Sequence, residues 1–210
     1  MTILALEFSS TRRSVALARG GVVLAEADAA GGRATHAFGL IEQVLAAAKI
    51  HRDEIRVIAV GMGPGSYTGI RAAIALAQGW QLARGINLLA VSSMDAIAAR
   101  AQAVNLFGQV NLVVDAQRGE FYLAKWEISA EQRREISPLV IVAAAEVEQR
   151  QRAGEMVAGP AASDPGKVLF PVASAVALLG EGRKDFIAGE KLAPIYLRET
   201  SFVKALPPRN

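Results

Sequence analysis

The chain has no cysteine among its 210 residues, and only two histidines. The absence of cysteine excludes disulfides, thiolate metal ligands and a cysteine nucleophile, and it fits a reducing cytoplasm. No apolar run approaches the roughly 20 residues that span a bilayer. The first ten residues lack the charged leader of a signal sequence. We therefore expect a cytoplasmic protein without a membrane segment.

Hydrophobic residues make up 52% of the chain and charged residues 20%, which is typical of a folded globular protein. The length allows one full domain or two small ones, either of which can bury a core. The formal net charge of +3 permits an RNA-binding partner but does not demand one. Composition therefore indicates the class of protein and leaves its function open.

Hydrophobic periodicity predicts an α/β order in the first part of the chain. Alternating or β-branched apolar runs indicate strands, and apolar residues at helical spacing indicate helices. Gly20 and Gly21 predict a two-residue hairpin turn between the second and third strands. The expected elements are strands at 3–8, 14–19 and 22–27, a helix at 36–49, a strand at 57–60, a helix at 71–84, a strand at 88–91 and a helix at 94–103.

The same order begins again after a polar interruption at residues 102–108. The second set consists of strands at 110–114, 121–126 and 136–142, a helix at 143–152, a strand at 156–158 and a helix at 172–179. We therefore predict two βββαβα halves, residues 1–103 and 104–210. The last segment of the second half could pack back on the first.

A glycine-rich loop joins the strand at 57–60 to the helix that follows it. Its characteristic residues are Gly63, Pro64, Gly65, Ser66, Tyr67, Thr68, Gly69 and Arg71. Glycine permits positive φ or close backbone approach, and the hydroxyls of Ser66 and Thr68 can cap the start of a helix. Such a loop either cradles an anion or lets another backbone segment come close.

Spacing excludes three familiar motifs for this loop. A phosphate-binding loop of the Walker type requires a lysine after its last glycine, and here Gly69 is followed by Ile70. A dinucleotide fingerprint has glycines at its first, third and sixth positions, whereas here they stand at the first, third, fifth and ninth. A serine nucleophile elbow has glycines two residues on either side of the serine, where Ser66 has Pro64 and Thr68.

The loop resembles the signature of a bacterial family, the TsaB (YeaZ) proteins, through the run from Gly63 to Arg71. Further matches lie at residues 4–7 with 9–11, 14–17, 114–122 and 194–198, so the resemblance covers nearly the whole chain. Two departures are Glu7, where the family commonly has aspartate, and Phe8, where it has threonine. The proteins of this family are subunits of the system that makes threonylcarbamoyladenosine in tRNA.

The resemblance implies the actin-like ATPase (ASKHA, ribonuclease H-like) fold, with mixed sheets flanked by helices and two halves facing each other across a cleft. Glu7 and Asp115 would then lie at the mouth of the cleft, each at the end of the first strand of its half. Paired acids there could hold magnesium with phosphates, or each could bond the N–H groups of its own turn. We favour the second interpretation because neither motif contains a lysine or a second acid.

Arg71 and the histidines have several interpretations. Arg71 could contact phosphate or tRNA, pair with a partner subunit, or form a salt bridge to Glu7 or Asp115. His36 and His51 do not have the spacing of four residues with which the catalytic relatives bind metal on one helix. We therefore expect no metal site.

The resemblance also implies protein partners: the catalytic subunit TsaD and the ATPase TsaE. The first two helices of the family contact TsaD, and small residues on the second helix let another helix approach closely. The predicted interface, or the core beneath it, consists of Phe38, Ile41, Val44, Leu45, Ala75, Gly79 and Leu82. Without its partner the chain is expected to form a homodimer through the same apolar helices.

The leading hypothesis is a non-catalytic scaffold subunit. It would bind and activate TsaD in the complex that transfers a threonylcarbamoyl group to adenosine 37 of tRNAs reading ANN codons, with tRNA bound through the complex. No cofactor would be required, although ATP or ADP with magnesium could bind at the interface of the complex. The alternatives are a small ATPase or phosphotransferase that uses Glu7 and Asp115 and, with less physical support, a glycoprotease-like metallopeptidase.

Overall fold

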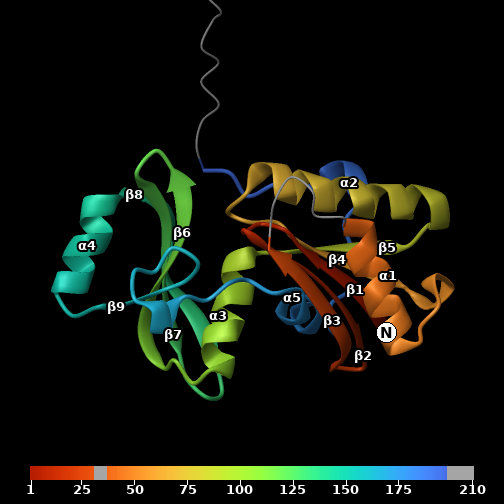
Figure 1. Ribbon diagram of the computed structural model, residues 1–210, viewed down its shortest axis with the longest axis horizontal. Helices are drawn as coiled ribbons and strands as arrows, with labels where there is room; N and C mark the ends of the chain where they lie inside the picture. The colour runs from red at the N-terminus through yellow and green to blue at the C-terminus, as the bar shows by residue number, and fades with distance from the viewer. Residues whose placement is uncertain (31–36, 198–210) are drawn as a thin grey trace, which may run out of the picture.

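The structure is a computed structural model, which describes residues 1–30 and 37–197 (Figure 1). Two β-sheets lie side by side, with helices between them and on their outer faces. The strand order is β3-β2-β1-β4-β5 in the first sheet and β8-β7-β6-β9 in the second. Among the described residues, no helix combines the length and apolarity needed to cross a bilayer.

The first sheet is built on β1 (Thr2–Glu7), in which every residue is buried. It pairs antiparallel with β2 (Arg12–Arg19), which pairs with β3 (Val22–Ala30), and parallel with β4 (Val57–Gly61), which pairs with β5 (Asn87–Val91). Because side chains alternate along a strand, Leu4 and Leu6 face one helical layer, whereas Ile3 and Ala5 face the other. The continuous apolar sequence of β1 thus reflects burial on both faces.

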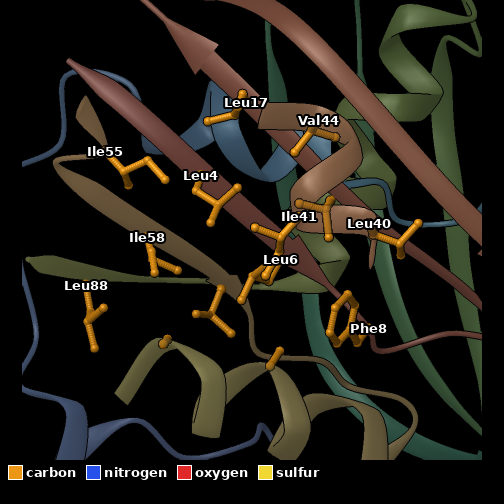
Figure 2. Close-up of a cluster of buried hydrophobic side chains, with 14 of the residues drawn as sticks. Leu4, Leu6, Phe8, Leu17, Leu40, Ile41, Val44, Ile55, Ile58 and Leu88 are labelled. Carbon is orange, nitrogen blue, oxygen red and sulfur yellow. The ribbon is translucent and has the colours of Figure 1, made fainter. Parts of the chain in front are cut away.

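The layer on the Leu4 and Leu6 side consists of α1 (Ala37–Ala48) and α2 (Tyr67–Arg84). Figure 2 shows Leu40, Ile41 and Val44 of α1 among the side chains of β1 and β2. Three members of the predicted interface, Ile41, Val44 and Leu45, are therefore core residues, because no more than 6% of any of them is exposed. Phe38, expected on the same stripe, is 65% exposed.

The second sheet consists of β6 (Gly108–Gln117), β7 (Glu120–Ile128), β8 (Arg133–Ala143) and β9 (Met156–Ala158). Its two faces are covered by α3 (Ser93–Ala103) and α4 (Ala144–Arg152). By contrast, α5 (Ala173–Gly180), which follows the second sheet in sequence, packs on β1 and β2 of the first. The helix that follows each sheet along the chain therefore covers the other sheet. The predicted division of the chain after residue 103 stays a prediction.

The structure also contains short helical turns outside the expected elements. Three 3-10 turns lie at η1 (Arg52–Glu54), η2 (Pro165–Lys167) and η3 (Gly189–Lys191).

The glycine loop is shorter than predicted because α2 begins at Tyr67, four residues before the expected start. The Ser66 hydroxyl caps this helix by accepting a hydrogen bond from the Gly69 N–H at 3.3 Å. Thr68, the other predicted cap, lies inside the helix.

Two substitutions on α1 test the division between core and surface. We expect Ile41→Ala to lower the free energy of unfolding by about 2–5 kcal/mol, because it leaves a cavity under the first sheet. Phe38→Ala should change it by less than about 0.5 kcal/mol, since that side chain is exposed. Urea denaturation of both variants measures the difference. Equal losses would contradict the placement of α1.

Candidate functional site

The glycine loop packs directly against the backbone that follows β1. The Ser66 N–H donates a hydrogen bond of 2.6 Å to the carbonyl oxygen of Ser9. A Cβ atom on Gly65 would lie 2.1 Å from that oxygen, and one on Gly69 would lie 2.0 Å from the carbonyl oxygen of Phe8. Side chains have no room at these two positions. The glycines thus serve a close approach of two backbone segments, which is one of the two uses expected for the loop.

Glu7 lies beneath this contact and is completely buried. Its Oε1 accepts a hydrogen bond from the Ser9 N–H at 2.8 Å, and its Oε2 accepts one from the Ser93 hydroxyl at 2.8 Å. The Ser93 oxygen in turn accepts the Gly63 N–H at 3.0 Å. One carboxyl group therefore joins the end of β1, the glycine loop and the first residue of α3.

Burial and hydrogen bonds act in opposite directions on the pKa of the Glu7 carboxyl. Burial raises the pKa of its carboxyl above the ordinary 4.5, and hydrogen bonds from Ser9 and Ser93 offset part of the rise. The space beside it is also filled, because a Cβ atom on Gly61 would lie 1.9 Å from Glu7 Oε2. The expectation that Glu7 lies at the mouth of a cleft is therefore wrong, since it faces the protein interior.

A cleft of about 840 Å³ does lie between the two halves. It is bordered by the turn after β1, the N-terminal end of α2, the β6–β7 turn and the C-terminal segment. Its lining includes Ser9, Gly65, Tyr67, Asp115, Arg118 and Tyr196. Asp115 accepts hydrogen bonds from the backbone N–H and the side-chain amide of Gln117, at 2.7 and 2.8 Å. It thus makes the turn bonds that we favoured for it.

The residues of the cleft do not fit magnesium and a nucleoside triphosphate, the ligand that the ATPase fold implies. Magnesium prefers carboxylate oxygens, and phosphates prefer cationic donors. Glu7 is absent from the lining, and both oxygens of Asp115 accept hydrogen bonds within its own turn. The described lining contains one arginine, Arg118, but no lysine. Residues 1–30 and 37–197 also contain no group of three His, Asp or Glu side chains that could hold a metal ion.

Two tyrosines lie together at the cleft, one from each end of the chain. The ring centroids of Tyr67 and Tyr196 are 5.7 Å apart, with the planes tilted by 55°. The Arg71 guanidinium lies 5.3 Å from the centre of the Tyr67 ring, and its Nη1 donates to the Tyr67 hydroxyl at 3.2 Å. The salt bridge considered between Arg71 and Glu7 or Asp115 does not form, and in the described part of the chain Arg71 has no ion pair.

An apolar surface lies on the other side of α2, toward α1. Leu82 is 91% exposed, and Ala75 and Gly79 are also exposed. A Cβ atom on Gly79 would meet nothing within 4 Å. Beside it lies a hollow of about 180 Å³, lined in part by Phe38 and Trp80. We call Phe38, Ala75, Gly79 and Leu82 the α1–α2 surface; these are the exposed members of the predicted interface.

Two ion pairs flank the α1–α2 surface, between Glu42 and Arg52 and between Asp53 and Arg84. His51 is exposed beside them, and His36 lies outside the described residues. Sequence reasoning missed Ser93 and Tyr196 as site residues. Ser93 precedes the helix expected at 94–103, and Tyr196 lies in the matching segment 194–198. Neither position indicates a site by itself, because the contacts of both residues cross distant parts of the chain.

The sequence and the fold both match known proteins. The sequence matches the family described as "TsaD: tRNA N6-adenosine threonylcarbamoyltransferase" over residues 3–198. The tRNA threonylcarbamoyladenosine biosynthesis protein TsaB of Escherichia coli K12 is 28% identical over 235 residues, which cover 99% of each chain. The protein of the same name in Bacillus subtilis 168 is 30% identical over 129 residues, 60% of this chain and 56% of that one.

Two solved structures from Pseudomonas aeruginosa share the fold. One, an uncharacterized protein with similarity to peptidase YEAZ, has a TM-score of 0.80 and 26% identity, covering 94% of this chain and 99% of that one. The other, YeaZ, has a TM-score of 0.77 and 24% identity, covering 93% and 99%. With the observed sheet order, these matches confirm the predicted actin-like fold of two mixed sheets flanked by helices.

Buried Glu7 predicts a pH-dependent stability. Because its pKa is raised in the folded state, its contribution to stability is fully present below about 4.5 and is lost as pH rises through the raised pKa. Between these values the free energy of unfolding should fall with a slope approaching about 1.4 kcal/mol per pH unit. Glu7→Gln should remove this component, as measured by urea denaturation across pH. Asp115→Asn, at an exposed acid of the equivalent strand, is the control; an unchanged profile in Glu7→Gln would contradict the prediction.

Two glycines of α2 should respond in opposite ways to alanine. Gly69→Ala should lower the free energy of unfolding by about 1–3 kcal/mol, because its Cβ would meet the Phe8 carbonyl. Gly79→Ala should raise it by about 0.5–1 kcal/mol, since that position is helical and open. Thermal or urea unfolding of the two variants measures both effects. Stabilisation by Gly69→Ala would refute the close approach.

Proposed function

We propose that this chain, which belongs to the TsaB (YeaZ) family within the tRNA N6-adenosine threonylcarbamoyltransferase family, is a non-catalytic scaffold subunit of the bacterial tRNA-modifying complex. Members of the family take part in forming threonylcarbamoyladenosine in tRNA. In the proposed role the chain binds and activates TsaD, which transfers the threonylcarbamoyl group to adenosine 37 of tRNAs reading ANN codons. The ATPase TsaE joins the same complex in the cytoplasm.

The α1–α2 surface is the observation that carries this proposal. Leu82 of α2 is 91% exposed, and Phe38 of α1, which is 65% exposed, borders the same hollow as Gly79 of α2. Covering such side chains removes apolar area from water, and each contributes on the order of 1 kcal/mol or more when fully buried. Gly79 and Ala75 present little bulk between them, so a partner helix can approach α2 closely. In this proposal, a helix pair from a homologous subunit covers the surface.

The chemistry of the cleft favours a non-catalytic role for this chain. The acid at the end of β1 is buried and bonded to Ser9 and Ser93, so it is not available to a substrate. The acid at the end of β6 is engaged in its own turn. In this proposal the chain requires no cofactor for its own part. ATP or ADP with magnesium would bind at the boundary with the partner, and tRNA through the complex.

The α1–α2 surface also bears on the oligomeric state of the chain without its partner. An uncovered apolar patch on a water-exposed helix pair favours self-association, because a second copy can cover it. We therefore propose a homodimer through α1 and α2 that exchanges for TsaD when the partner is present. Competition between the two states would follow directly from the shared surface.

A charged side chain at Gly79 should abolish pairing with TsaD. Gly79 points into open space, so Gly79→Arg should keep the unfolding transition of the lone chain while it blocks a close helix. Size-exclusion chromatography with purified TsaD measures the complex, and the modification assay measures transfer, which the lone chain should not support. Val22→Arg, at an apolar side chain that is 59% exposed on the edge strand β3, is the matched control. Normal pairing by Gly79→Arg, or transfer by the chain alone, would refute the proposal.

A further inference from the structure

The cleft between the two sheets has a feature that the scaffold role does not use: an exposed aromatic pair at its rim. Tyr67 is 48% exposed and Tyr196 is 46% exposed, although they touch each other. Their planes are tilted by 55°, so the rings do not cover each other's faces. Both rings line the cleft together with Phe121 and Phe170. Flat apolar faces are thus presented to a hollow that could hold a planar ligand.

Cationic groups lie on both sides of this rim. Arg71 is one turn along α2 from Tyr67 and is held over that ring. Arg118 lines the opposite side, on the β6–β7 turn. Among the described residues neither arginine forms an ion pair, whereas Arg12, Arg19 and several others do. In the described part of the chain, the charge of Arg118 in the cleft and that of Arg71 beside Tyr67 are therefore not paired with carboxylates.

The backbone conformation of the β6–β7 turn indicates that Arg118 has a functional position. Gln117 and Arg118 have φ values of 65° and 61°, in the left-handed region that glycine and asparagine prefer. Bulky residues persist in such conformations when the surrounding structure imposes them, and these positions concentrate at functional sites. Asp115 imposes the conformation here by accepting hydrogen bonds from Gln117. The turn thereby places a long cationic side chain at the cleft.

We propose that this cleft binds an unpaired nucleotide of RNA, with the base stacked on Tyr67 and Tyr196 and the flanking phosphates near Arg71 and Arg118. Proteins that recognise single-stranded RNA combine aromatic faces with arginines that neutralise the backbone. The cleft volume of about 840 Å³ lies within the range of about 300–1,000 Å³ typical of ligand pockets, so one nucleotide fits. The inference deepens the proposed function and rests on it for the identity of the RNA, a tRNA with unpaired loop nucleotides.

A single-stranded nucleotide fits better than the other ligands that a cleft of this fold could hold. A magnesium nucleotide fits less well, because the carboxylate of Asp115 is engaged in its own turn and the described lining contains no lysine. Double-stranded RNA hides the faces of its bases, so it cannot use the tyrosine pair. The combination of half-exposed rings and arginines without ion pairs matches a base that is free to leave its stack.

Binding of labelled RNA to the full-length chain tests the proposal. Fluorescence anisotropy would compare a fluorescein-labelled single-stranded RNA of about 10 nucleotides with a blunt duplex of the same sequence. We expect the single strand to bind more tightly than the duplex. Tyr67→Ala and Tyr196→Ala should each weaken it on the order of 10-fold, whereas Tyr67→Phe, which keeps the ring, should bind like the wild type. Arg71→Gln should reduce the slope of log affinity against log salt by about 0.7.

The control is Phe107→Ala, at an aromatic side chain that is 40% exposed just before the opposite end of β6. It should leave RNA binding unchanged. Equal affinity of wild type and Tyr67→Ala, a preference for the duplex, or binding of free AMP without binding of RNA would each overturn the inference. Gly79→Arg separates the two proposals: it should lose TsaD but keep RNA. Normal TsaD pairing with no RNA binding would overturn this inference alone.

Discussion

Contact between two backbone segments, the turn after β1 and the loop before α2, determines where the rest of the first half lies. The contact exists because Gly65 and Gly69 have no side chains, and the buried Glu7 carboxyl holds its inner side by bonding to Ser9 and Ser93. Burying a charged or polar group is unfavourable unless hydrogen bonds satisfy it, and here both carboxyl oxygens are satisfied. Two hydrogen bonds therefore fix the position of Glu7. A small shift of the loop would leave a buried carboxyl oxygen of Glu7 without its donor.

The direction of α2 follows from this contact and gives the helix two separate functions. Its first residue, Tyr67, lines the cleft with Arg71 one turn further on, and its later turns carry Gly79 and Leu82 on the α1–α2 surface. A straight helix of 18 residues transmits its orientation along about 27 Å. A glycine-rich loop can bind an anion, but here the loop positions the helix that follows it. The loop sets the angle of the helix, and the helix presents both surfaces.

Much of the fold was predictable from local patterns, because local patterns report periodicity. The βββαβα order, the hairpin at Gly20 and Gly21, and the end of the second helix at residue 84 depend on neighbours in sequence, and the structure has all three. What failed depends on contacts between distant segments. Phe38 and Ile41 were both predicted at the interface or in the core beneath it, but only the position of α1 over β2 and β3 decides which of them is covered. The burial of Glu7 and the meeting of Tyr67 with Tyr196 have no local pattern at all.

Each sheet is completed by a helix from the other half of the chain. Met94 and Ile97 of α3 pack on the second sheet, whereas Ala173, Val176 and Ala177 of α5 pack on the first, and the two helices contact each other between the sheets. The two halves therefore share one cooperative unit, because neither sheet can bury both of its faces with its own helices. A cleft that lies between mutually dependent halves keeps its shape for the same reason, since neither side can loosen without uncovering the core of the other.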